Sequence, residues 1–183
     1  MPRQARGRVH AGIYHVWRRA TGPVDMFLDD FDRTAFCKRL AISIRRHSVN
    51  CVAFVLMPTH FHLVVEVDDD TLPVAMHDCF GPYAQQFNRR HGRNGHLRAA
   101  PYKLRAVDET DHALRAIVRY VARNPVRSRL SLEPQDWTWS SYRGSAGYEP
   151  PFPFVKDELL IGSIHEDVTK ARQLLRDIVE ARM

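Results

Sequence analysis

The sequence predicts an α+β domain with the ferredoxin-like split βαβ arrangement, in which an antiparallel sheet carries helices on one face and leaves the other face for an active site. Two observations support this prediction. Strand-like apolar segments and helix-like segments follow one another in the order β-α-β-β-α-β-α. Only the middle two strands are joined by a tight turn, Pro58-Thr59, and a hairpin between two helical crossovers is the pattern of this fold.

Local sequence predicts each element in turn. Four strands rich in β-branched and aromatic residues are expected at residues 9–17, 49–57, 60–67 and about 102–107. Three helices are expected, from Asp29 or Asp30 to about Arg46, from about Leu72 to Arg90, and from Thr110 past Pro125. The first helix is expected to bury a face containing Phe31, Ala35, Leu40 and Ile44. Gly81-Pro82 predicts a kink or break in the second helix, because proline lacks the N–H that a helix interior uses.

Length and composition indicate one globular unit. The chain has 183 residues, 44% of them hydrophobic, which suits one domain with a full core. Pro150-Pro151-Phe152-Pro153 indicates a linker, so we divide the chain into a main domain, residues 1–149, and a Pro-rich linker with a helical C-terminal tail, residues 150–183. The three cysteines form no C-x-x-C pair, and no apolar run is long enough to span a bilayer. We therefore expect a cytoplasmic protein that does not bind membranes.

The charge balance favours a polyanionic partner. The net charge is +6, and most of the positive charge comes from arginine, whose guanidinium group binds phosphate through a planar fork of donors. A solvated basic surface without such a partner would give the same composition. Charge alone therefore does not identify the partner.

Two histidines share one face of the third predicted strand. Side chains alternate along a strand, so His60 and His62 point to one side, and the wholly apolar set of Phe61, Leu63, Val65 and Val67 points to the other. The apolar set is the core face, which places both imidazoles on the opposite face, about 7 Å apart at their Cα atoms. Two neutral imidazoles at that separation can share a divalent cation, although two solvated surface histidines would give the same pattern.

The third predicted helix carries a tyrosine and an asparagine one turn apart. Its buried stripe contains Leu114, Ile117, Val118 and Val121, and three arginines line up on the far side at Arg115, Arg119 and Arg123. Tyr120 and Asn124 lie at the border between the two and share a face. A tyrosine at such a border is often structural. In a functional reading its hydroxyl attacks a phosphodiester, and the Asn124 carboxamide oxygen completes a metal site.

Five motifs in order give the chain a resemblance to a known family. They are YHV at 14–16 followed by Arg18-Arg19, VLMPTHFHL at 55–63, FNRRH at 87–91, RYVARNPVR at 119–127 and WTWSSY at 137–142. Through these motifs the chain resembles the REP-associated tyrosine transposases, relatives of the single-tyrosine HUH transposases of small bacterial insertion sequences. The resemblance covers about residues 8–148.

The resemblance implies a reaction and a set of site residues. It implies Tyr120 as the nucleophile, His60, His62 and Asn124 as metal ligands, and Mg²⁺ or Mn²⁺ as the cofactor, with no nucleotide cofactor. The implied substrate is single-stranded or hairpin-forming DNA at REP palindromes, cut to leave a 5′-phosphotyrosine and a free 3′-OH and then rejoined. Such a protein acts as a monomer or homodimer and associates with the nucleoid. The residues expected to contact DNA are Arg18, Arg19, Lys103, Arg115, Arg119, Arg123 and Arg127.

One departure from the family pattern leaves alternatives open. Pro101 stands where the family has an arginine before Tyr102-Lys103, and Arg98 or Arg105 could compensate for that loss. The chain could therefore be a domesticated relative that holds hairpin DNA or RNA without cutting it. A replication-initiator or relaxase-like nickase would share the histidine pair and the tyrosine chemistry. The intact Tyr120 and Asn124 favour the transposase over the binding protein, and the YxxxNPVR and WSSY motifs favour it over the nickase.

Overall fold

The computed structural model describes residues 9–21, 25–93, 97, 99–108 and 110–181. The strands are β1 (Gly12–Arg19), β2 (Asn50–Met57), β3 (His60–Val67) and β4 (Lys103–Ala106). The helices are α1 (Asp30–Arg46), α2 (Leu72–Arg90), α3 (Asp111–Ala122), α4 (Asn124–Arg127), α5 (Tyr142–Ser145), α6 (Glu158–Ile164) and α7 (Val168–Glu180), with a 3₁₀ turn at Pro134–Asp136. Within the described residues, no helix is both long and apolar enough to cross a membrane.

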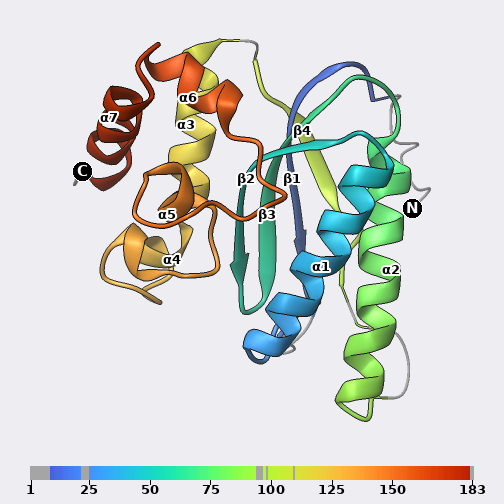
Figure 1. The fold of residues 1–183 in the computed structure, drawn as a ribbon. Helices are drawn as coiled ribbons and strands as arrows, with labels where there is room; N and C mark the ends of the chain where they lie inside the picture. The colour runs from blue at the N-terminus through green and yellow to red at the C-terminus, as the bar shows by residue number, and fades with distance from the viewer. Residues whose placement is uncertain (1–8, 22–24, 94–96, 98, 109, 182–183) are drawn as a thin grey trace.

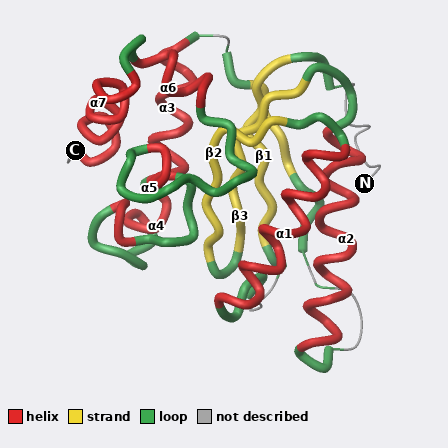
Figure 2. Tube along the Cα trace, in the orientation of Figure 1, coloured by secondary structure: helices red, strands yellow, loops and turns green. Residues whose placement is uncertain are grey.

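The four strands form one antiparallel sheet with the order β2-β3-β1-β4. The Pro58-Thr59 turn joins β2 to β3, and α1 and α2 form the two crossovers on one face of the sheet (Figures 1 and 2). This strand order, with both crossovers on the same face, is the ferredoxin-like arrangement. The fold class predicted from the sequence is therefore confirmed.

The main core lies between the sheet and the helices α1 and α2. From β3 it takes the predicted apolar set Phe61, Leu63, Val65 and Val67, each at most 2% exposed. Phe27, Phe36, Phe61 and Tyr83 pack against one another across this layer, with ring centroids 5.0–5.6 Å apart. Aromatic pairs at such distances add to the stabilisation from buried apolar area. Helix α1 begins at the predicted cap, because the Asp29 carboxylate accepts a hydrogen bond from the Asp32 amide.

Two expectations about the helices are wrong. Phe31 is 59% exposed, because α1 turns Phe36 and Leu40 to the core instead; its ring lies under the guanidinium group of Arg90. A break at Gly81-Pro82, one of the two expected outcomes, is also wrong, because α2 runs as one helix from Leu72 to Arg90. A proline inside a helix removes one backbone hydrogen bond, and here residues on both sides of it, Phe80 and Tyr83, are anchored in the core.

A second helical layer covers part of the opposite face. Helix α3 lies over β2 and β3, and its Leu114, Val118 and Val121 are buried against Val55 and Val64 of the sheet. Helices α6 and α7, formed by residues of the C-terminal tail, pack behind α3 (Figure 1). Their buried side chains belong to the same cluster: Leu160, Ile161, Ala171, Leu175 and Val179. The sequence did not indicate that these helices form a layer. Among the described residues, this layer leaves the β1 and β4 side of the face uncovered.

Candidate active site

His60 and His62 lie on the face of β3 that looks toward α3, as strand alternation predicts. Their ring centroids are 5.1 Å apart and their planes are perpendicular. The sequence suggested that this face is open to solvent, but α3 covers it. His60 is 8% exposed and His62 is 5% exposed. Such burial is unusual for solvated surface histidines. Two buried imidazoles side by side instead suit a shared ligand.

One ring nitrogen of each histidine is already bonded to a neighbouring side chain. A hydrogen bond of 2.8 Å joins His62 Nδ1 to Nε2 of His15 on β1. Another, of 3.0 Å, joins His60 Nδ1 to the Thr59 hydroxyl. Metal-binding histidines commonly use one ring nitrogen in this way, which fixes the ring and directs the other nitrogen to the metal. In both residues Nε2 is the nitrogen left for a ligand.

Burial keeps all three imidazoles neutral at neutral pH. Desolvation lowers the pKa of His62 to about 3, and the charges that would form on His15 and His60 act in the same direction. Desolvation, together with the positive charge of Arg105, lowers the pKa of His15 to about 4. Burial and the nearby Arg19 also lower the pKa of His60, while a hydrogen bond with the Asn124 side chain opposes that shift. Neutral imidazole is the form that binds metals.

The end of α3 and the start of α4 bring Tyr120 and Asn124 to the histidines. Thr110 caps the helix by accepting a hydrogen bond from the Ala113 amide, and the helical turns are interrupted at Arg123, two residues before Pro125. The Tyr120 ring packs edge-on to His62 with ring centroids 5.5 Å apart, and the residue is 36% exposed. Asn124 is 7% exposed, and its side chain opposes the lowering of the His60 pKa, so it lies close to that imidazole. The four residues predicted as nucleophile and ligands therefore meet at one place.

These donors fit a hard divalent cation. Asn124 Nδ2 donates to the Tyr120 carbonyl oxygen at 3.3 Å, so the carboxamide oxygen is the atom left to ligate. With Nε2 of His60 and His62, it gives the mixed N/O set that Mg²⁺ and Mn²⁺ accept. In the part of the chain that the structure describes, no three His, Cys, Asp or Glu side chains are grouped to hold a metal. A metal at this site would therefore depend on Asn124.

The structure adds three residues that the sequence did not assign to the site. In the sheet register, His15 of β1 lies opposite Val64 and Arg105, and Trp17 lies opposite His62 and Lys103. Paired residues in antiparallel strands point to the same face, so His15, Trp17 and Arg105 share the face of the histidine pair. His15 falls within the YHV motif, which is the one sequence signal that could have found it. Arg98, the other residue considered as a replacement for the missing arginine, lies outside the described residues.

Three of the predicted DNA-contacting residues border the site. Arg19 is exposed at the end of β1, and its charge lowers the pKa of both His60 and His62. Lys103 is exposed on β4, next to Trp17. The guanidinium carbon of Arg127 lies 5.3 Å from the centre of the Tyr120 ring. Of the three, Arg127 lies beside the Tyr120 ring, whereas Arg19 lies opposite His60 and Lys103 opposite Trp17 in the sheet register.

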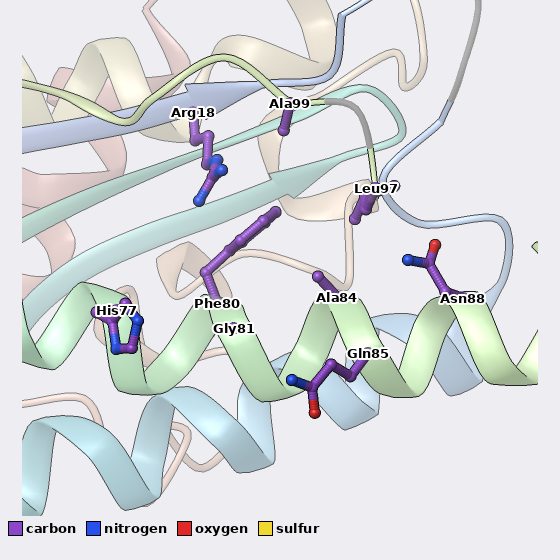
Figure 3. Close-up of a pocket in the computed structure, with 9 residues that line it drawn as sticks. All are labelled: Arg18, His77, Phe80, Gly81, Ala84, Gln85, Asn88, Leu97 and Ala99. Carbon is purple, nitrogen blue, oxygen red and sulfur yellow. The ribbon is translucent and has the colours of Figure 1, made fainter. Parts of the chain in front are cut away.

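Arg18 does not join the site. Strand alternation sends it to the opposite face of the sheet from Arg19, where its guanidinium group stacks 3.5 Å above the Phe80 ring of α2. Figure 3 shows it there, in a pocket of about 380 Å³ between α2 and the segment that carries Leu97 and Ala99. Arg18 and Arg19 are neighbours in the chain, and the sequence therefore placed both at the DNA. Their side chains point to different layers.

The three arginines of α3 are half-buried and turned toward the C-terminal helices, a placement that the sequence did not predict. Arg115 donates to the Ser163 carbonyl of α6, Arg119 donates to the Ile178 carbonyl at 2.7 Å, and Arg123 donates to the Val179 carbonyl at 2.7 Å. Arg119 and Arg123 also reach the Ala181 carbonyl. The carbonyls at a helix C-terminus lack partners within the helix and attract cations. The sequence could not show that α7 packs on this side of α3.

A solved structure has the same fold over nearly the whole chain. No protein-family model matches the chain, and no curated protein matches it in sequence. A REP-associated tyrosine transposase bound to a REP hairpin matches with a TM-score of 0.65 and 17% sequence identity, over 92% of this chain and 94% of that chain. A proposed transposase from Deinococcus radiodurans matches with a TM-score of 0.45 and 19% identity, over 66% of this chain and 95% of that chain. The resemblance seen in the sequence motifs is thus confirmed at the level of the fold.

Proposed function

We propose that this chain is a transposase that cuts and rejoins single-stranded, hairpin-forming DNA through a covalent phosphotyrosine. The observation that carries the proposal is the meeting of Tyr120, His60, His62 and Asn124. Two separate segments of the chain bring these residues together, in the arrangement that such chemistry needs. The transposase of similar fold that was solved with a REP hairpin supports the choice of substrate.

The reaction proposed for Tyr120 is a transesterification. Its hydroxyl oxygen attacks the phosphorus in line with the 3′ oxygen, forms a phosphotyrosine bond and loses its proton. The bond from phosphorus to the 3′ oxygen breaks, and that oxygen leaves as a free 3′-OH on the upstream fragment. The protein then carries the 5′ end of the downstream fragment, and attack by a 3′-OH on the phosphotyrosine rejoins the strand. The energy of the broken bond is kept in the intermediate.

A tyrosine hydroxyl needs assistance for this attack, and the site offers a place for it. His60, His62 and Asn124 would hold Mg²⁺ or Mn²⁺. When bound, the ion neutralises charge on the non-bridging phosphate oxygens. His15 holds the ring of His62 in position through the bond between their ring nitrogens. Asn124 holds the end of α3 through its bond to the Tyr120 carbonyl oxygen.

The DNA backbone is proposed to run over the uncovered part of the sheet face. This region carries the exposed cations Arg19, Lys103 and Arg105 on β1 and β4, with Arg127 beside Tyr120. Arginine and lysine at the protein surface are the usual phosphate ligands. Arg115, Arg119 and Arg123 donate to carbonyl oxygens of the C-terminal helices, so we assign the phosphate contacts to the first group instead.

A labelled hairpin strand tests the proposal. Incubation of the protein with 3′-labelled single-stranded hairpin DNA and Mn²⁺ should give labelled DNA that co-migrates with protein in a denaturing gel. Tyr120→Phe should lose this band and still shift the DNA in a native gel, because only the hydroxyl is removed. Tyr148→Phe, which removes an exposed hydroxyl far from the histidines, is the matched control and should keep the band. Cleavage without a covalent band would replace the tyrosine mechanism with hydrolysis.

One observation favours a second candidate, a protein that binds hairpin DNA without cutting it. Pro101 is exposed two residues before β4, at the position where the family that the chain resembles carries an arginine. Loss of a phosphate contact at that point would weaken the grip on the substrate strand. The same gel separates the candidates: a binder shifts the DNA in the native gel and yields neither cleaved strand nor covalent band at any Mn²⁺ concentration.

A further inference from the structure

Three rings form a row that leads away from the histidine pair. The imidazoles of His62 and His15 are nearly parallel, with centroids 5.0 Å apart and planes at 20°, and the 2.8 Å hydrogen bond between their nitrogens places them edge to edge. The indole of Trp17 stacks on His15, at 4.7 Å and 22°. The three residues come from neighbouring strands, because Trp17 lies opposite His62 in the register of β1 and β3. Trp17 is thus the outer end of a row of rings whose inner end is a candidate metal ligand.

Trp17 lies where the sheet face is uncovered and basic. It is half-buried, and its neighbour across β4 is the exposed Lys103, with Arg105 two residues further along that strand. Arg19 follows it on the same face of β1. The two described hydrophobic clusters of the protein do not include Trp17, whereas the other two tryptophans, Trp137 and Trp139, pack against them. The indole is therefore held by the ring stack and is not needed to fill the core.

We propose that Trp17 is a stacking platform for one base of the substrate strand, adjacent to the phosphodiester that Tyr120 attacks. This inference rests on the proposed function. An aromatic ring flanked by cations is the arrangement that binds single-stranded nucleic acid, because each base presents a flat face and each phosphate a charge. The Tyr120 ring lies 5.9 Å from the His15 ring on which Trp17 stacks, so the platform and the nucleophile share one face of the sheet.

The proposal predicts that binding depends on one base and on the Trp17 indole together. The probe is a fluorescent DNA hairpin with oligothymidine flanks, titrated in EDTA so that no strand is cut. In the wild-type protein, an abasic nucleotide at one flanking position should weaken binding about 5- to 150-fold, the range for loss of one base–aromatic stack. Trp17→Ala should weaken binding of the intact strand to the same extent. The abasic strand should then bind Trp17→Ala no more weakly than the intact strand does.

Control variants separate this inference from a general loss of structure or of function. Trp17→Phe keeps an aromatic face and should retain most of the affinity and the dependence on the same position. Binding should quench the tryptophan fluorescence of wild type and of Trp139→Phe, and the quenching should be lost in Trp17→Phe. If the loss of affinity from Trp17→Ala adds to the loss from an abasic nucleotide at every flanking position, the inference is overturned and the proposed function stays in place. Failure of the wild-type protein to bind any hairpin strand would overturn both.

Discussion

The side-chain amide of Asn124 donates a hydrogen bond to the backbone carbonyl oxygen of Tyr120, one turn earlier in the chain, at 3.3 Å. Because the nitrogen is used within the helix, the oxygen is the atom presented to the histidine pair. The same side chain thereby orients the tyrosine turn and supplies the third donor of the candidate metal site.

The first prediction concerns this asparagine. Asn124→Ala removes the carboxamide oxygen, and we expect the Mn²⁺ concentration for half-maximal cleavage to rise at least about 10-fold. Asn124→Asp keeps an oxygen ligand and adds a negative charge, so it should need less Mn²⁺ than Asn124→Ala does. Strand cleavage measured over a Mn²⁺ titration gives both values. Equal Mn²⁺ dependence of wild type and Asn124→Ala would remove Asn124 from the metal site.

The second prediction concerns His15, which touches the candidate ligand His62 but no proposed reacting atom. A side chain that hydrogen-bonds to a metal-binding histidine typically contributes about 10- to 100-fold to metal affinity or activity. His15→Ala should therefore lose about 10- to 100-fold. His15→Gln retains an amide that can bond to His62 Nδ1 and should recover part of the loss. The readout is again the Mn²⁺ titration, because a merely structural role would lower the maximal rate without shifting the metal requirement. His77→Ala, on the exposed side of α2, is the matched control and should behave as wild type.

The fold and the histidine pair are predictable because local rules determine them. Alternation along β3 separates His60 and His62 from the apolar set Phe61, Leu63, Val65 and Val67, and this assignment needs no knowledge of the neighbouring strands. The one-turn spacing of Tyr120 and Asn124 follows in the same way from helix geometry. Both patterns involve residues close together in the chain, where sequence distance largely fixes spatial distance, although Asn124 begins a separate short helix, α4.

The remaining site residues depend on contacts between distant elements. His15 and His62 are 47 positions apart, and their bond depends on the register of β1 against β3. The sequence contains the strands but not that register. Arg119 and its carbonyl partner on α7 are 59 positions apart, and the position of α7 depends on how the apolar faces of two amphipathic helices meet. The sequence shows that such faces exist, although it does not show where they dock.

The third prediction concerns the link between α3 and α7. Arg119 donates to two carbonyls at the C-terminus of α7, and hydrogen bonds made by charged groups contribute about 1.5 to 3 kcal/mol. Arg119→Ala should lower the free energy of unfolding by about 1 to 3 kcal/mol, which urea denaturation followed by circular dichroism measures. Arg129→Ala, at an exposed position after α4, should change it by less than about 0.5 kcal/mol. Equal stability of the two variants would show that the link contributes nothing.

The fourth prediction uses salt dependence to identify the DNA-binding arginines. For a single strand, the logarithm of the binding constant falls with the logarithm of salt concentration with a slope of about −0.7 for each phosphate contact. Substituting both Lys103 and Arg127 by alanine should therefore make the slope less negative by about 1.4, because Lys103 lies beside Trp17 on the proposed DNA path and Arg127 lies beside Tyr120. Substituting both Arg115 and Arg123 by alanine removes the same charge from the chain and should leave the slope unchanged, because their donors bind carbonyl oxygens of the C-terminal helices. Titrations at several salt concentrations, at a temperature where circular dichroism shows every variant folded, compare the two pairs directly. A flatter slope for the second pair, with no change for the first, would place the DNA on the α7 side of the tyrosine helix and contradict the path over β1 and β4.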